Sequence, residues 1–232
     1  MGFEKAGFET KIAIDMWDDA VKTYNHNRSN KVAVCEDVHN WTEEYLDKLV
    51  ADGDVVGIIG GPPCQGYSTV GTRDVNDPRN HLYTEYCRIV ETVKPDFFVI
   101  ENVKGLLTLS GGAFRDDIHT RFEALGYTVR DKVVNAADYG VPQRRKRVFI
   151  IGCLDMITFE QPKPLFSEDG IGLPGYVTVQ EAIGSLPVVE DGGGDKVMEC
   201  EYDNPTLYDK LMTREIDFDT FYEGCKKRMG CF

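Results

Sequence analysis

The stretch VVGIIGGPPCQGYS, residues 55–68, decides the fold, because a run of small and branched apolar residues ends abruptly at two prolines. The run over residues 55–60 is typical of a buried strand. Proline cannot continue a central strand and fixes its own backbone angle, so the prolines hold Cys64 in a stiff loop at the carboxyl end of that strand. In open α/β sheets, ligands bind at this edge. Cys64 is therefore either a buried structural cysteine, the usual role of a free thiol, or a nucleophile.

The composition is that of an ordinary globular protein of 232 residues, which is enough for one sizeable domain with a small appendage. A net charge of −13 argues against a broad basic surface for nucleic acid. Seven cysteines without a C-x-x-C pair and four isolated histidines give no zinc spacing, so no metal site is expected. The cysteine pattern indicates reduced thiols. The sequence also shows no signal-peptide pattern and no apolar run of about 20 residues. We therefore expect a cytoplasmic protein.

Strand-like and helical segments alternate along the first half of the chain. The strands are expected at 11–15, 31–35, 55–60 and 97–100, and the helices at 16–27, 42–51, 81–93 and 114–125. The first helix should carry Trp17, Ala20, Val21 and Tyr24 on one face. Two further strands, 127–135 and 147–153, follow without a helix between them. The pattern predicts a doubly wound α/β fold whose parallel sheet is closed by an antiparallel hairpin.

The character of the sequence changes after Cys153. Residues 159–175 are rich in proline and glycine, DGGGD at 191–195 is a flexible break, and the tail from residue 198 is polar without strong periodicity. We therefore expect a core over residues 1–155 and a second region over residues 156–232.

Three polar segments follow or flank the predicted strands. They are Pro63-Cys64-Gln65, Glu101-Asn102-Val103 and Gln143-Arg144-Arg145-Lys146-Arg147. Positive charge nearby lowers the pKa of a cysteine thiol, and a sheltered carboxylate can hold or deliver a proton. Taken singly, Glu101 could cap a turn, Asn102 could form one, and the arginines could be a solvated face. Together the three segments predict a catalytic site.

The ordered segments resemble the cytosine-C5 DNA methyltransferases of bacterial restriction–modification systems. The resemblance rests on GGPPCQGYSTVG, DFFVIENVKGLL and NAADYGVPQRRKRVFIIG, supported by AIDMWDDAVKTYNHN, CEDV and DPRNHLYTEYCRIVETVKPDFF, and it covers roughly residues 1–190. It implies that residues 1–155 form a Rossmann-like, S-adenosyl-L-methionine-dependent methyltransferase sheet with an antiparallel hairpin at one edge.

The resemblance also implies a mechanism on double-stranded DNA with a flipped cytosine. Cys64 would attack C6 of the base, Glu101 would contact its N3 edge with support from Asn102, and Arg145 and Arg147 would hold the base and a phosphate. Further residues matching the substrate-binding motifs are Gln65, Ser68 and Gln143. Those matching the binding site of the methyl donor, S-adenosyl-L-methionine, are Asp15, Met16, Asp37, Val38, Pro62 and Leu82.

The sequence departs from the family at both ends. The Phe-x-Gly-x-Gly turn that binds the amino-acid end of the donor is absent, so the first strand of the sheet is expected to be missing, and the target recognition region is expected to be truncated. The chain would then be a fragment, or one part of a split enzyme that needs a second polypeptide. Two alternatives stay open at this point: a tRNA cytosine-C5 methyltransferase, and a catalytically incompetent DNA-binding or regulatory subunit.

Overall fold

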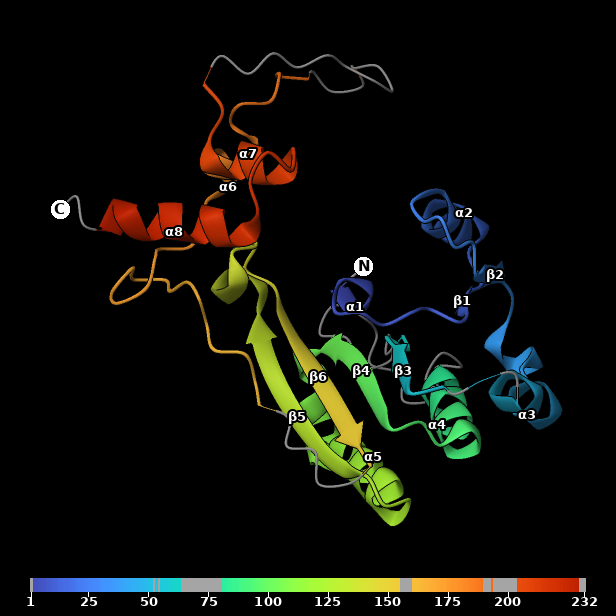
Figure 1. Cartoon of the computed structure of the whole chain (residues 1–232). Coiled ribbons are helices and arrows are strands. Elements are labelled where there is room, and N and C mark those ends of the chain that lie inside the picture. Colours follow the sequence, from blue (N-terminus) through green and yellow to red (C-terminus); the bar gives the residue numbers. More distant parts are fainter. Residues whose placement is uncertain are drawn as a thin grey trace. The chain divides into compact units, whose positions relative to one another are not determined.

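The structure, a computed structural model, describes residues 2–51, 53, 55–63, 81–154, 160–189, 193 and 204–229. The chain divides into two compact units (Figure 1). Unit 1 comprises residues 1–132 and 148–159, and unit 2 comprises residues 133–147 and 160–232. Among the described helices, none is long and apolar enough to cross a membrane. The functional division expected near residue 155 stays a prediction.

Unit 1 begins with short elements around a two-stranded parallel sheet. They are α1 (Gly2–Lys5), β1 (Ala13–Asp15), α2 (Asp18–His26), β2 (Ala33–Cys35), the 3-10 helix η1 (Val38–Asn40) and α3 (Glu43–Ala51). Strands β1 and β2 pair with Asp15 opposite Cys35. The N-cap of α3 is Thr42, whose hydroxyl oxygen accepts a hydrogen bond from the Tyr45 N–H over 3.2 Å.

A four-stranded sheet follows, in the order β3-β4-β6-β5. Its elements are β3 (Gly57–Gly60), α4 (His81–Val93), β4 (Phe97–Val103), the 3-10 helix η4 (Lys104–Gly112), α5 (Ala113–Ala124), β5 (Thr128–Asn135), the 3-10 helix η5 (Ala136–Tyr139) and β6 (Lys146–Cys153). Strands β3 and β4 are parallel, whereas β5 and β6 run in opposite directions as the hairpin at the edge (Figure 1). The predicted hairpin is thus present.

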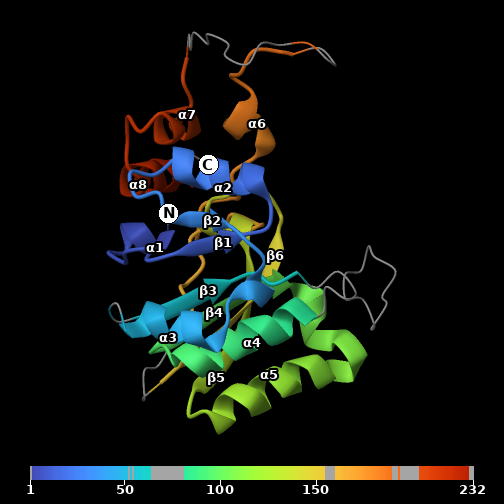
Figure 2. The same cartoon turned by 90° about the vertical axis from the view of Figure 1, so that its right-hand side faces the viewer.

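Helices α3, α4 and α5 lie on the same side of β3 and β4 (Figure 2). Phe98 of β4 points to this side and is fully buried, with its ring 4.1 Å from that of Phe122 in α5 and 5.2 Å from that of Tyr127. Because side chains alternate along a strand, Phe97 points to the opposite face. There Phe3 and Phe8 pack on it, with ring centroids 6.2 and 5.5 Å away.

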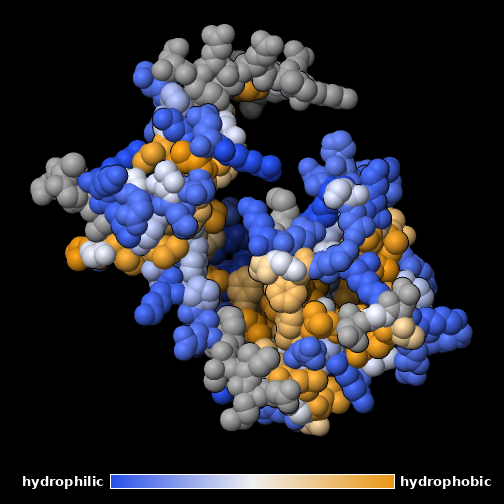
Figure 3. All heavy atoms as spheres, viewed as in Figure 1, coloured by the Kyte–Doolittle hydropathy of each residue, from blue (hydrophilic) through white to orange (hydrophobic). Residues whose placement is uncertain are grey.

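Strands β1 and β3 share one core although they belong to separate sheets. Ile14 of β1 and Ile58 of β3 both pack against the buried cluster of Trp41, Leu46, Ile89 and Val93. On the surface, Ile59 of β3 is 50% exposed. Hydrophobic atoms also come to the surface around α1, β3 and β4 (Figure 3). The described residues thus leave β1 and β3 side by side under the same helices without a hydrogen-bonded ladder between them.

Among its described residues, unit 2 contains three α-helices that we did not predict from the sequence. They are α6 (Val179–Ile183), α7 (Leu207–Met212) and α8 (Phe218–Met229). Helix α7 begins with a capping box formed by Thr206 and Asp209. Phe221 of α8 is buried against Phe166 in a separate hydrophobic cluster. The polar tail, whose periodicity is weak, therefore contains the two helices α7 and α8.

Two local expectations also need correction. Trp17 does not lie on the buried face of the first helix: it precedes α2 as its N-cap and is 68% exposed, while Val21 is buried. Glu101 and Asn102 do not follow the strand but belong to it. The pairing of β4 with β3 ends at Ile100, but the backbone of β4 stays extended to Val103.

Candidate active site

The carboxyl ends of β3 and β4 bring two of the predicted catalytic segments together. In the parallel register Gly60 lies opposite Ile100, so the chain after Gly60 and the chain after Ile100 leave the pairing side by side. The first leads through Pro62 to Cys64, and the second is the Glu101-Asn102 segment. This edge of the sheet is where ligands bind in open α/β folds.

Asn102 fastens the proline segment to β4. Its side-chain Nδ2 donates a hydrogen bond to the carbonyl oxygen of Pro62 over 3.0 Å, and its Oδ1 accepts one from the Val103 N–H over 2.8 Å. The residue is 7% exposed, so both polar ends of the amide need these partners. Asn102 therefore fixes the position of the backbone two residues before Cys64.

Glu101 lies close to the same segment. Its Oε2 would be 3.3 Å from a Cβ added at Gly61, a contact tighter than ordinary van der Waals distance. The side chain is half-buried. A glycine at position 61 therefore leaves room for the Glu101 carboxylate beside the loop that carries the thiol.

Tyr86 is a positioning residue that the sequence alone did not single out. Its hydroxyl lies 3.1 Å from the Ile58 carbonyl oxygen and 3.0 Å from that of Val99, so it bridges β3 and β4. Burial raises the pKa of Tyr86, which keeps the hydroxyl protonated as a donor. A Cβ on Gly60 would lie 2.7 Å from the Tyr86 ring. The signal in the sequence was the apolar face of α4, on which Tyr86 lies.

Cys64, Gln65 and Ser68 lie outside the described residues. Three described cysteines offer a contrast with the predicted nucleophile. Burial raises the pKa of the Cys87 thiol to about 11 and also raises the pKa values of Cys153 and Cys225. These three thiols stay protonated at neutral pH, which disfavours them as nucleophiles.

The parallel pairing of β1 and β2 brings the first donor-binding candidates together. Asp15 ends β1 opposite Cys35, the last residue of β2, and Met16 follows it. The Cys35 thiol donates to the Met16 carbonyl oxygen over 3.5 Å. Asp15 Oδ1 accepts a hydrogen bond from the Trp17 N–H over 2.8 Å. Met16 and Trp17 are 66% and 68% exposed, so an acidic group and two large apolar side chains share this surface.

The remaining donor-binding candidates take on structural roles as well. Asp37 is the N-cap of η1, and the hydrogen bond from the His39 N–H, helped by the His39 ring, lowers the pKa of Asp37. Val38 is half-buried and packs against the core beneath β1 and β3. Leu82 lies half-buried in the first turn of α4.

The predicted DNA-binding arginines belong to unit 2. Residues 140–147, which we call the arginine loop, comprise the turn after η5 and the first two residues of β6. The side chains of Gln143 and Arg145 are exposed, and within the described part of the chain the Arg145 guanidinium has no hydrogen bond or ion pair. Arg147 is half-buried, and its Nη1 donates to the Lys146 carbonyl oxygen over 3.0 Å.

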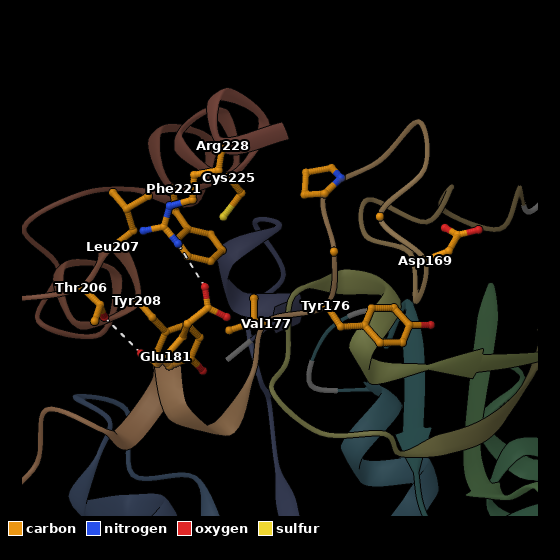
Figure 4. Close-up of a pocket in the computed structure, with 13 residues that line it drawn as sticks. Asp169, Tyr176, Val177, Glu181, Thr206, Leu207, Tyr208, Phe221, Cys225 and Arg228 are labelled. Carbon is orange, nitrogen blue, oxygen red and sulfur yellow. Dashed lines mark hydrogen bonds and ion pairs between the residues drawn. The ribbon is translucent and has the colours of Figure 1, made fainter. Parts of the chain in front are cut away.

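Unit 2 also holds a pocket of about 490 Å³. Glu181 and Arg228 form an ion pair of 3.0 Å on one side of it, near Thr206 and Tyr208 (Figure 4). The Tyr176 ring points away from that group (Figure 4). Among the described residues, none of those predicted for catalysis or binding lines this pocket.

The sequence matches the family of C-5 cytosine-specific DNA methylases over residues 1–190. Among curated relatives, the Type II methyltransferase M.DdeI of Desulfomicrobium norvegicum is 40% identical over 208 residues, covering 85% of this chain and 48% of that protein. M.AgeI of Thalassovita gelatinovora is 37% identical over 250 residues, covering 99% of this chain and 58% of that protein. The chain thus spans about half the length of the curated relatives it matches.

Solved structures agree with this similarity. An E. coli prophage protein described as a DNA modification methyltransferase superimposes with a TM-score of 0.68 at 29% identity, over 89% of this chain and 58% of that one. The Dnmt2 methyltransferase of S. pombe shares the fold, with a TM-score of 0.53 at 22% identity over 66% of this chain and 45% of that one. The predicted Rossmann-like sheet with a hairpin at one edge is confirmed.

Proposed function

Because the chain belongs to the family of C-5 cytosine-specific DNA methylases, we propose that it carries the catalytic centre of a DNA (cytosine-5-)-methyltransferase. The methyl donor of this family is S-adenosyl-L-methionine, and the acceptor that we propose is C5 of a cytosine in double-stranded DNA. The DNA-directed activity is favoured over the tRNA-directed alternative because the curated relatives named above are Type II methyltransferases.

One observation supports this function most strongly. The 3.0 Å hydrogen bond from Asn102 to Pro62 ties the backbone that leads to Cys64 to the strand that carries Glu101. A nucleophile and a proton-handling carboxylate must be held in a fixed mutual geometry to act on one ring. Strands β3 and β4 supply that rigidity, and Tyr86 reinforces it.

In the reaction that we propose, the Cys64 thiolate forms a bond to C6 of the flipped cytosine. This addition breaks the C5–C6 double bond and shifts electrons through C4 to N3. Glu101 delivers a proton to N3, and the resulting enamine makes C5 nucleophilic. S-adenosyl-L-methionine would supply the methyl group that C5 takes up, and the electron pair of the broken sulfur–methyl bond would stay on its sulfur. Loss of the C5 proton to a base then expels the Cys64 thiolate, N3 returns its proton to Glu101, and the aromatic ring is restored.

The residues at the ends of β1 and β2 fit the adenosine part of this donor. Asp15 offers a carboxylate at a strand end, the device that binds ribose hydroxyls in dinucleotide folds, and its Oδ1 is oriented by the Trp17 N–H. The exposed Met16 side chain offers an apolar surface for the adenine ring. Asp37 and Val38 lie on the neighbouring turn after β2, while Pro62 and Leu82 would complete the wall.

Arg145 and Arg147 would hold the base and the neighbouring phosphate, since the planar guanidinium binds such groups through two parallel hydrogen bonds. Gln143, Gln65 and Ser68 would contribute further polar contacts to the DNA. The exposure of Arg145 supports this role.

We further propose that full activity needs a strand between β1 and β3 and a DNA-reading segment, supplied by a second polypeptide or by further chain. The shared core beneath two separate sheets supports this idea, because a strand in that position would pair with the facing edges of both. A glycine turn after that strand would bring backbone N–H groups close to the donor.

Transfer of tritium from labelled S-adenosyl-L-methionine tests the proposed function. Purified chain is assayed on unmethylated DNA and on tRNA, alone and mixed with polypeptides that carry the segments of its relatives outside the matched region. We expect little or no turnover alone, label in DNA cytosine with the mixture, and no label with a Cys64→Ala chain. Label in tRNA instead of DNA, or labelling that survives Cys64→Ala, contradicts the proposal.

A further inference from the structure

The arginine loop is a tight turn whose backbone depends on its surroundings in unit 2. The Ala136 N–H donates to the Arg145 carbonyl oxygen over 2.9 Å, and the Arg145 N–H donates to that of Gln143 over 3.0 Å. Gly140 has a φ of +85°, and a Cβ there would lie 2.9 Å from the ring of Phe166. The loop therefore starts from a glycine that the packing requires.

Arg144, between the two residues that match the Gln-x-Arg motif, points into a contact within the protein. Its Nη2 lies 2.7 Å from Glu168 Oε1, and its guanidinium lies 5.9 Å from the centre of the Tyr176 ring. The Arg144 and Glu168 side chains are 71% and 66% exposed. Exposed ion pairs of this kind contribute little to stability by themselves, so Glu168 alone does not hold Arg144 in place. The second partner of Arg144 is the ring of Tyr176.

Tyr176 is held at both its backbone and its hydroxyl group. Its N–H donates to the Ser167 carbonyl oxygen over 3.1 Å, and its hydroxyl donates to Asp138 Oδ1 over 2.6 Å. The Asn135 side-chain Nδ2 donates to both the Tyr176 hydroxyl oxygen and Asp138 Oδ1, each over 3.3 Å. The hydrogen bond to the Asp138 carboxylate raises the pKa of Tyr176, so the donor stays protonated at neutral pH.

We propose that Tyr176 is a positioning residue that holds the arginine loop in the conformation in which Arg145 binds DNA. Tyr176 links η5, through Asp138, to Arg144 in the loop, and the side chain of the neighbouring Arg145 is exposed. The inference rests on the proposed function of Arg145. It adds a residue beyond the three catalytic segments that carry the family resemblance.

The first test measures the loop itself. Hydrogen–deuterium exchange is followed by mass spectrometry in the whole chain, in a Tyr176→Phe variant and in a Tyr139→Phe control. Tyr176→Phe keeps the ring under Arg144 but removes the bond to Asp138, whereas Tyr139 donates over 2.8 Å to the Pro162 carbonyl oxygen. We expect exchange at 140–147 to rise about tenfold only in Tyr176→Phe, as loss of one hydrogen bond to a charged group allows. Unchanged exchange overturns the proposal.

The second test asks whether Tyr176 acts through Arg145. Affinity for a labelled DNA duplex is measured at low salt, in the mixture with the complementing polypeptides, for the natural chain, Tyr176→Phe, Arg145→Ala and the double variant. Thermal unfolding serves as a check on folding. We expect both single variants to bind DNA more weakly than the natural chain and the double variant to bind no worse than Arg145→Ala. If Tyr176 acts only through Arg145, the losses of binding free energy caused by the two substitutions do not add. A further independent loss in the double variant means a merely structural role and contradicts the proposal.

The two tests separate this inference from the proposed function. If Arg145→Ala leaves the DNA affinity unchanged, the proposed role of Arg145 is wrong, and with it the DNA-binding part of this proposal. If Arg145→Ala weakens binding but Tyr176→Phe does not, the function stands and the positioning role of Tyr176 is wrong.

Discussion

At the scale of single residues, the candidate site depends on a buried amide. Asn102 uses its nitrogen for the Pro62 carbonyl and its oxygen for the Val103 N–H. A carboxylate of the same shape accepts the second bond but cannot donate the first. It also brings a charge next to a carbonyl oxygen in a site that is 7% exposed.

We therefore predict that Asn102→Asp lowers the free energy of unfolding by about 1–3 kcal/mol, the cost of leaving a buried polar group unpaired. Urea denaturation at pH 7 measures this loss. Asn27→Asp is the matched control, because the exposed Asn27 amide also donates to a backbone carbonyl, over 2.8 Å, and its replacement should cost less than about 1 kcal/mol. Equal losses in the two variants would mean that the bond to Pro62 contributes nothing special.

The sequence predicted the types of residue in this site better than their contacts. Cysteine, glutamate and arginine at strand ends follow from the order of motifs along the chain. The bond between Asn102 and Pro62 joins residues 40 positions apart and depends on the register of β3 with β4, which no local pattern specifies. The role of Tyr86 was not predicted for the same reason. Its apolar neighbours in α4 account for its burial, but they do not indicate that its hydroxyl bridges two strands.

At the scale of elements, α1 shows how a short helix is held by contacts outside itself. A helix of four residues is not stable in isolation. Phe3 packs on Phe97 of β4, and the Glu4 carboxylate pairs with the Arg28 guanidinium over 2.8 Å. The Arg28 guanidinium in turn lies 3.5 Å from the centre of the Tyr24 ring.

This ion pair predicts a pH dependence of stability. The hydrogen bond from Arg28 lowers the pKa of Glu4 from 4.5 to about 2. A carboxyl group whose pKa is lower in the folded state stabilises the fold above its unfolded pKa, and that contribution disappears as the pH falls through its folded pKa. Glu4→Gln should therefore lower the urea midpoint at pH 7, and the difference from the natural chain should shrink between pH 4.5 and about 2.

Glu9→Gln provides the control for that series, because within the described residues Glu9 has no ion pair or hydrogen bond of its side chain. It should leave the midpoint at pH 7 unchanged. A Glu4→Gln difference that stays constant down to pH 2 would show that the loss does not come from the charged pair.

Elements with a clear period were predicted well, and elements hidden in polar sequence were not. Helix α4 has the predicted bounds, His81–Val93. Helices α7 and α8 were missed although their signals were present. Thr206 and Asp209 have the spacing of a capping box, and Phe218, Phe221, Tyr222 and Cys225 follow the 3.6-residue period of one helix face. The many charged residues between these positions concealed the period.

At the scale of the whole molecule, the alternation of strands and helices predicted the sheet and its edge hairpin. The split into two sheets follows from which strands are present among the described residues. Strands β1 and β3 bury their apolar side chains under the same helices, so side-chain packing joins the two sheets where backbone pairing does not. The proposed function depends on how the two sheets are joined, because Asp15 lies at a strand end of one sheet and Glu101 at a strand end of the other.

The central claim is that Cys64 is the nucleophile of a cytosine methyltransferase, and DNA containing 5-fluorocytosine tests it most directly. Fluorine at C5 cannot leave as a proton does, so the bond between the thiol and C6 persists after methyl transfer. The chain is incubated with this DNA and S-adenosyl-L-methionine, alone and with the complementing polypeptides, and the adduct is mapped by mass spectrometry. We predict one cross-linked peptide, containing Cys64, and none from a Cys64→Ala chain; an adduct on another of the seven cysteines, or no adduct under any of these conditions, would contradict the account.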